Sequence, residues 1–191
     1  MAALTSNDIL NRALVLIGDN QAPVQGTWPA FDNSAAGQAG NIIYQDCVQA
    51  VAREYGYDFS RTPVVLQLSG NFPPTGWLYD YLYPPLALQI RELFPVTGTY
   101  DINDPLPNNF TVASEPVNNV PTKVIYANLV NAEAYITGQP PENLWDALFV
   151  EAVVRRVAAA LSMGTAGRPD FARAMLESAA GTAQLGQRRD G

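Results

Sequence analysis

The chain has 191 residues, of which 48% are hydrophobic and 15% are charged, a balance typical of a globular protein with a packed core. It contains no histidine and one cysteine, Cys47, which excludes an internal disulfide and argues against a zinc or iron site, because the usual nitrogen and sulfur ligands are missing. The net charge of −7 argues against sequence-specific recognition of DNA, because an acidic protein repels the phosphate backbone.

The charge is unevenly distributed along the chain. Residues 1–154 carry 5 basic and 15 acidic side chains, a net charge of −10, whereas residues 155–191 carry 6 basic and 3 acidic side chains, a net charge of +3. A soluble acidic surface that ends in a solvated basic tail is a sufficient explanation of this asymmetry, and it requires no binding function.

The N-terminal segment predicts an amphipathic helix. Thr5 and the polar residues after it offer N-cap oxygens, and apolar residues then recur at helical spacing until Gly18. Because Asp8 and Arg12 lie inside this pattern, the segment is more typical of such a helix than of a signal peptide. No apolar run approaches the roughly 20 residues that a membrane span needs, so we expect an intracellular protein without a membrane segment.

After a loop over residues 19–31, a second helix is expected over 34–57, and the composition then changes to β-branched, aromatic and turn-forming residues. We expect strands over 62–69 and 77–83, a short helix over 86–93, and a long, partly ordered segment over 94–121 with one short strand at 110–114. Strands over 123–129 and 131–137 are expected to pair as a hairpin. Four aromatic side chains should share one face of the 77–83 strand: Trp77, Tyr79, Tyr81 and Tyr83.

The strongest helix is predicted between Pro141 and Gly164, with the proline in its first turn. Apolar residues cover most of its surface, so neighbouring elements should bury it. Its expected core positions are Leu144, Leu148, Val157 and Leu161. A last helix beginning at Pro169 places apolar and small residues at a seven-residue repeat that ends at Leu185.

These elements predict an α+β fold, a four-helix bundle with a small antiparallel β region inserted between helices two and three. The expected domains are a helical bundle over 1–60 and 139–186, a β-rich insertion over 61–138, and a C-terminal tail over 187–191.

Candidate catalytic groups are few. Without histidine, neither a Ser-His nor a Cys-His pair can form, and Cys47 lies among apolar helical neighbours, which is typical of a structural thiol. Acid–base hydrolysis would need a pair of carboxylates, for which Asp80 with Glu92, or Asp101 with Asp104, are the nearest candidates. Surface or turn-forming roles explain the same residues. We expect no catalytic residue, metal ion or cofactor.

The aromatic strand has two further interpretations. Its side chains could form a stacking platform for a sugar or a base, or fill the inner face of a small sheet. The polar ends of the tyrosines would also suit a protein interface.

Several segments, in this order, resemble the head-to-tail adaptor proteins of tailed bacteriophages, the tail tubular protein A family of short-tailed phages. They are TSNDILNRALVLIG at 5–18, REYGYDFSR at 53–61, WLYDYLYPPLALQIREL at 77–93, VIYANL at 124–129 and PENLWDALFVEAVVRRVAAALS at 141–162. The resemblance covers nearly the whole chain, and the order of the segments is its most specific feature.

The resemblance implies a non-enzymatic virion protein at the head–tail junction, made in the host cytoplasm. It implies a homo-oligomeric ring of twelve copies below the portal protein, which surrounds the passing genomic DNA without reading its sequence and provides the attachment surface for the next tail, or nozzle, protein. The C-terminal segment would dock on the portal through Leu185, Gln187, Arg188 and Arg189. The alternatives are a small carboxylate-dependent hydrolase of glycans or cell walls, and a binding module that uses the aromatic strand.

Overall fold

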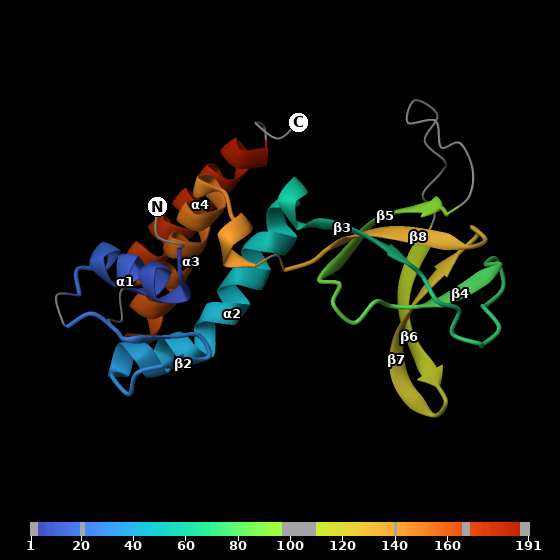
Figure 1. Cartoon of the computed structure of the whole chain (residues 1–191), viewed down its shortest axis with the longest axis horizontal. Coiled ribbons are helices and arrows are strands. Elements are labelled where there is room, and N and C mark those ends of the chain that lie inside the picture. The colour runs from blue at the N-terminus through green and yellow to red at the C-terminus, as the bar shows by residue number, and fades with distance from the viewer. Residues whose placement is uncertain (1–3, 20–21, 97–109, 140, 166–168, 188–191) are drawn as a thin grey trace. The chain divides into compact units, whose positions relative to one another are not determined.

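The structure, a computed structural model, describes residues 4–19, 22–96, 110–139, 141–165 and 169–187. The chain divides into two compact units (Figure 1). The first, called the helical unit, comprises Met1–Phe59 and Gln139–Gly191, and the second, called the β unit, comprises Ser60–Gly138. The two ends of the β unit are joined directly, because the Gly138 N–H donates to the Ser60 carbonyl at 2.8 Å.

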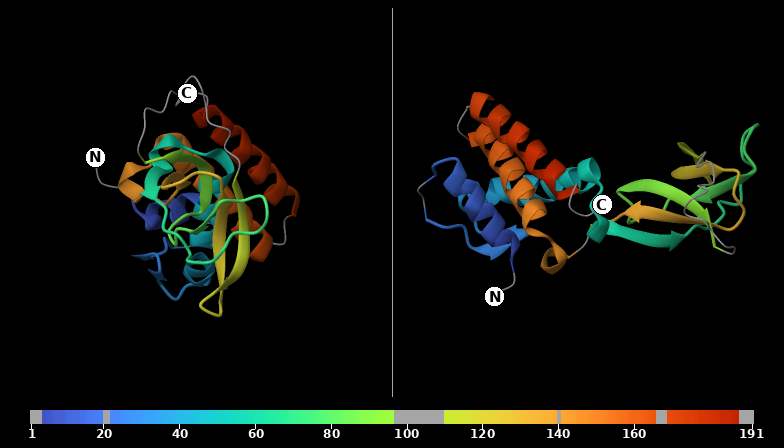
Figure 2. Two further views of the ribbon diagram at one scale, coloured as in Figure 1. Left: turned by 90° about the vertical axis from the view of Figure 1, so that its right-hand side faces the viewer. Right: turned by 90° about the horizontal axis from the view of Figure 1, so that it is seen from above.

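Where the structure describes it, the helical unit has four α-helices: α1 (Ser6–Leu16), α2 (Ala35–Tyr55), α3 (Ala147–Thr165) and α4 (Pro169–Gln187). A two-stranded ribbon of β1 (Gly26–Thr27) and β2 (Ala30–Phe31) lies in the loop between α1 and α2, and the 3₁₀ helix η2 (Glu142–Leu144) precedes α3. A second 3₁₀ helix, η1 (Asp58–Ser60), leads into the β unit. Helices α3 and α4 lie side by side (Figure 2).

Local hydrogen bonds explain where α1 and α2 begin and end. The Asp8 carboxylate accepts from the Thr5 N–H at 3.0 Å while the Thr5 hydroxyl accepts from the Asp8 N–H, which makes a capping box at the start of α1. The Ser34 side chain caps α2, and Gly56, with φ of 50°, ends it in the left-handed conformation that glycine adopts at low cost.

Helix α3 provides the core of the helical unit. Phe149, Val153 and Val157 are fully buried along it, together with the small residues Ala152 and Ala158. Helix α4 faces α3 with two buried alanines seven residues apart, Ala172 and Ala179. Small side chains on both helices allow their backbones to approach closely, and this contact is the most extensive one between helices of the unit.

The predicted start of the central helix is wrong. Asp146 caps α3, since its Oδ1 accepts from the Phe149 N–H at 2.7 Å, whereas Pro141 precedes the separate 3₁₀ turn η2. The predicted core position Leu144 therefore lies before the helix and is 56% exposed. Of the other predicted core positions, Leu148 is half-buried, and Val157 and Leu161 are buried.

The described residues of the β unit form six strands: β3 (Arg61–Val65), β4 (Tyr79–Leu82), β5 (Gln89–Pro95), β6 (Phe110–Val117), β7 (Val120–Ala127) and β8 (Ala132–Thr137). They form two antiparallel sheets with the strand orders β3-β8-β5 and β4-β7-β6. The expected four-helix bundle with a small β insertion is therefore wrong: the described residues form four α-helices and eight strands in three sheets, a mixed α+β structure in which the β part is a substantial unit.

The predicted helix over residues 86–93 is also wrong, because Gln89–Pro95 forms the strand β5. Ile90 and Leu93 are both buried although they are three residues apart, a spacing that suggests a helix. In a regular strand they would point to opposite faces. A register shift between Ile90 and Glu92, opposite β8, inserts one extra residue and brings both side chains to the inner face.

A third correction concerns the predicted hairpin of residues 123–129 and 131–137. Strand β7 is the middle strand of one sheet and β8 is the middle strand of the other, so the two strands do not pair. The hairpin that does form joins β6 to β7 through Asn118 and Asn119, which have positive φ values of 52° and 64°. Two adjacent asparagines suit such a turn because asparagine tolerates the left-handed region.

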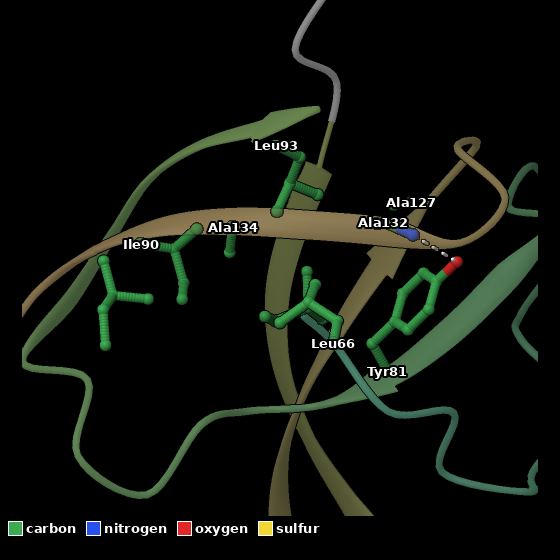
Figure 3. Packing of buried hydrophobic residues seen from close by; sticks show 9 residues of the cluster. Leu66, Tyr81, Ile90, Leu93, Ala127, Ala132 and Ala134 are labelled. Atoms are coloured by element: carbon green, nitrogen blue, oxygen red, sulfur yellow. Dashed lines mark hydrogen bonds between the residues drawn. The ribbon is translucent and has the colours of Figure 1, made fainter. Parts of the chain in front are cut away.

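One apolar cluster joins the two three-stranded sheets. Ile90, Leu93 and Ala134 come from one sheet, Tyr81 and Ala127 come from the other, and Leu66 follows β3 (Figure 3). The Tyr81 hydroxyl donates to the Leu129 carbonyl at 2.7 Å and accepts from the Ala132 N–H at 3.4 Å. It therefore bridges the two backbone groups at the point where the chain passes from one sheet to the other.

Replacing Tyr81 with phenylalanine tests this bridge. The Tyr81→Phe variant keeps the ring but leaves the Leu129 carbonyl and the Ala132 N–H without this partner, so we expect a loss of about 1–3 kcal/mol in the free energy of unfolding. Urea denaturation measures it. The matched control is Tyr79→Phe, because the described residues show no hydrogen bond to that hydroxyl, and it should change stability much less. Equal losses in both variants would contradict the proposed bridge.

Candidate functional site

The most unusual polar group of the β unit is the carboxyl of Asp80 in β4. It is 2% exposed and lies directly opposite Tyr126 of β7 in the sheet. The Ser69 hydroxyl donates to Asp80 Oδ2, whereas the buried Oδ1 receives no hydrogen bond from a donor in the described residues. A buried carboxylate without such a partner is costly, so a proton on the Asp80 carboxyl is favoured.

Glu115 of β6 is the second carboxyl of this group. Its Oε1 accepts from Asn71 Nδ2 at 2.6 Å, and its Oε2 accepts from the Tyr126 hydroxyl at 2.7 Å. These hydrogen bonds, together with one between the Asp80 and Glu115 side chains, lower the pKa of Glu115. At a pH between the two pKa values, Glu115 is therefore ionised while Asp80 keeps its proton.

The two carboxyls consequently have opposite pKa shifts. Burial raises the pKa of Asp80 to about 6, and the hydrogen bond and negative charge of Glu115 act in the same direction. The hydrogen bond to Glu115 also raises the pKa of Tyr126 to about 12. Carboxyls separated in this way can serve acid–base chemistry, but a general acid must contact its substrate, and the Asp80 side chain is almost completely buried.

The structure does not bring the predicted carboxylate pairs together as expected. Asp80 interacts with Ser69 and Glu115, whereas Glu92, in the other sheet, forms an ion pair with Arg61 at 3.1 Å. Asp101 and Asp104 lie outside the described residues. Cys47 is buried in α2, and burial raises the pKa of its thiol to about 11, so the reactive thiolate is disfavoured.

The predicted aromatic face is mostly part of the core. Tyr81 is buried, and Tyr79 and Tyr83 are partly buried against the same apolar cluster. The ammonium of Lys123 lies 3.7 Å from the centre of the Tyr83 ring, a cation–π contact that covers that ring. Trp77 precedes β4 and is half-buried. This arrangement supports packing of the tyrosines rather than a stacking platform.

The predicted docking strip falls at the C-terminal end of α4. The backbone of this helix continues through Leu185 to Gln187, so the helix ends later than its repeat predicted. Arg188 and Arg189 lie outside the described residues.

The helical unit has an open groove between α1 and α3 with a volume of about 680 Å³. Val15 and Leu16 of α1, which are 74% and 44% exposed, line it together with Val150 and Val154 of α3. Its charged lining residues are two acids and two bases: Asp8, Arg12, Glu151 and Arg155. Glu151 and Arg155 form an ion pair along α3, and Asp8 caps α1, so the groove is apolar with a balanced charged rim.

Sequence reasoning missed Glu115, Ser69 and Asn71, the residues that surround Asp80. They come from two separate segments, the loop at Ser69 and Asn71 and the strand β6, and neither a motif nor a periodic pattern connects them. Within the part of the chain that the structure describes, no group of three or more cysteine, aspartate or glutamate side chains is placed so that it could hold a metal ion. No described helix combines the length and the hydropathy that crossing a membrane requires.

A variant of Asp80 tests the buried carboxyl through the pH dependence of stability. The pKa of Asp80 is raised to about 6 in the folded state from about 4 in an unfolded chain, so its contribution is most favourable below pH 4 and is lost as the pH rises to 6. Asp80→Asn resembles the protonated form and lacks this loss. We expect the stability of the variant relative to wild type to increase between pH 4.5 and pH 8, measured by thermal melting. A pH-independent difference would mean that Asp80 is already ionised at pH 4.5.

Comparison with known proteins does not extend this description. Neither a scan against protein-family models nor a search of curated proteins finds a match for this chain. The function is therefore argued from its residues, their contacts and the uncovered surfaces.

Proposed function

We propose that the chain is a structural head-to-tail adaptor that forms a ring below a phage portal and offers its outer surface to the next tail component. The observation that carries the proposal is the apolar surface of the β unit. Of the fifteen large hydrophobic side chains that are exposed in the described residues, nine belong to this unit: Val65, Leu68, Phe72, Leu78, Leu86, Val96, Val112, Val120 and Val130. Partners that cover this unit in an assembly would bury these side chains, which is favourable.

Three further features support a structural role. The order of sequence segments resembles the adaptor family along nearly the whole chain. The Asp80 carboxyl, whose raised pKa would suit acid–base catalysis, is too buried to contact a substrate. The net charge of −7 suits a ring around passing DNA, because an acidic lumen repels phosphate and lets the duplex slide.

The hydrolase alternative was predicted on Asp80 with Glu92 or Asp101 with Asp104, and in the described residues the carboxyl that lies beside Asp80 is that of Glu115 instead. It predicts that replacing both carboxylates with amides abolishes a glycan- or wall-degrading activity of the wild type. The adaptor proposal predicts no such activity in either protein. Activity in the wild type that is lost in Asp80→Asn/Glu115→Gln would contradict the adaptor proposal.

The mass of the purified protein, alone and mixed with portal protein, tests the adaptor directly. Light scattering or native mass spectrometry should find either a closed ring of the free chain or a ring that forms on the portal. A chain that stays monomeric in both conditions would contradict the proposal.

The C-terminal strip gives a more specific test. Leu185, Gln187, Arg188 and Arg189 are proposed to dock on the portal, because the planar guanidinium donors of arginine pair well with carboxylates or carbonyls in a crevice between subunits. Deleting residues 188–191 should leave the melting temperature unchanged and abolish co-sedimentation with portal, since a ring repeats each weak contact many times. Full retention of the truncated chain would place docking elsewhere.

A further inference from the structure

The loop between β3 and β4 carries the most exposed large hydrophobic side chain of the described residues. This segment, Gly70 to Gly76, is called the Phe72 loop, and its Phe72 is 98% exposed. Positive φ values of 86° and 99° at Gly70 and Gly76 turn the chain at its two ends. Burying a fully exposed phenyl ring against another molecule is favourable, so Phe72 offers a strong apolar contact to a partner.

The base of the Phe72 loop is fixed to the β unit on both sides. Asn71 Nδ2 donates to Glu115 Oε1 at 2.6 Å and to the Pro116 carbonyl at 3.1 Å, while the Asn71 N–H donates to the Ser69 hydroxyl at 3.0 Å. On the other side, Asn128 accepts from the Leu78 N–H at 2.9 Å.

The rest of the loop is restricted too. Pro73 and Pro74 limit the backbone, and the Trp77 N–H donates to the Pro74 carbonyl at 3.1 Å. A loop that is already ordered loses less conformational entropy when it binds, so Phe72 has the character of an interface anchor.

The groove between α1 and α3 has matching properties. Its volume of about 680 Å³ falls in the range of about 300–1,000 Å³ that accommodates a compact apolar group such as a phenyl ring beside two prolines. The exposed Val15 and Leu16 side chains leave apolar surface uncovered along one wall.

The distribution of charge favours a second copy of the chain as the molecule whose Phe72 loop fills the α1–α3 groove. Each copy has a net charge of −7, so two copies repel each other least where the facing surfaces carry no net charge. The loop sequence GNFPPTG has no charged residue, and the groove is lined by two acidic and two basic side chains that balance. The outer face of α4 and the C-terminal tail are both charged, which makes them poorer occupants.

We propose that Phe72 of one copy inserts into the α1–α3 groove of the next copy. The loop and the groove are different surfaces, so the contact is head-to-tail and propagates into a ring when the rotation between copies closes. This inference rests on the proposed ring and names the contact that holds it together.

Paired substitutions test the contact through the mass of the full-length protein. Phe72→Ser on the loop and Val15→Asp in the groove should each weaken self-association by at least about tenfold, measured by sedimentation over a concentration series. Both side chains are exposed, so both variants should fold, and circular dichroism confirms it. Ile42→Ser is the matched control: Ile42 is 75% exposed in α2 and does not line the groove, so its replacement should leave the association unchanged.

Cross-linking identifies the two surfaces directly. Cys47 is buried, so a short bis-maleimide reagent should react with introduced cysteines. The cysteines are placed beside the contact, at Thr75 in the loop and at Ala147 in the groove lining, so that Phe72 and Val15 are kept. Mixing the Thr75→Cys and Ala147→Cys chains should give a heterologous dimer, and a chain with both substitutions should give a ladder of multimers. Thr75-to-Thr75 or Ala147-to-Ala147 products in place of the mixed product would overturn the head-to-tail contact.

The outcomes separate this contact from the ring itself. A ring of unchanged stability in Phe72→Ser would overturn the contact while the adaptor proposal stands. A wild-type chain that remains monomeric with and without portal would overturn both.

Discussion

In the β unit the chain passes from one sheet to the other through a turn at residues 130–131, and the Tyr81 hydroxyl donates to the Leu129 carbonyl and accepts from the Ala132 N–H at the two ends of this turn. Strands β7 and β8, on either side of the turn, are each the middle strand of their own sheet. The apolar cluster then fills the space between the sheets, with alanines at 127, 132 and 134 keeping them close. One buried phenol thus supports the packing of all six strands, because its ring belongs to the core and its oxygen satisfies the crossover.

The helices could be predicted from the sequence because their signals are local. The cap at Thr5, the glycine at 56 and the proline at 169 act within a few residues, and α1, α2 and α4 begin or end close to them. The sheets depended on long-range pairing. The bulge beside Arg91 gave a strand the apolar spacing of a helix, and two consecutive strands joined by a short turn belong to different sheets. Both effects depend on a partner strand that the local sequence does not specify.

The candidate site was less predictable than the fold for the same reason. Asp80 was visible as one of several carboxylates, but its burial and its pairing with Glu115 arise only when β4, β6 and the segment at Ser69 meet. The apolar groove required two helices far apart in the chain. By contrast, the exposure of Phe72 follows from a loop sequence, NFPPTG, that combines turn residues with an aromatic ring.

The hydrogen bond that joins Gly138 to Ser60 closes the β unit at its base, so both connections to the helical unit leave from adjacent positions. The β unit has adjoining ends and its own core, and its described strands pair only with one another. Such a unit can be exchanged, enlarged or deleted during evolution without altering the helical unit into which it is inserted. The surface presented to partners can therefore change independently of the helical scaffold.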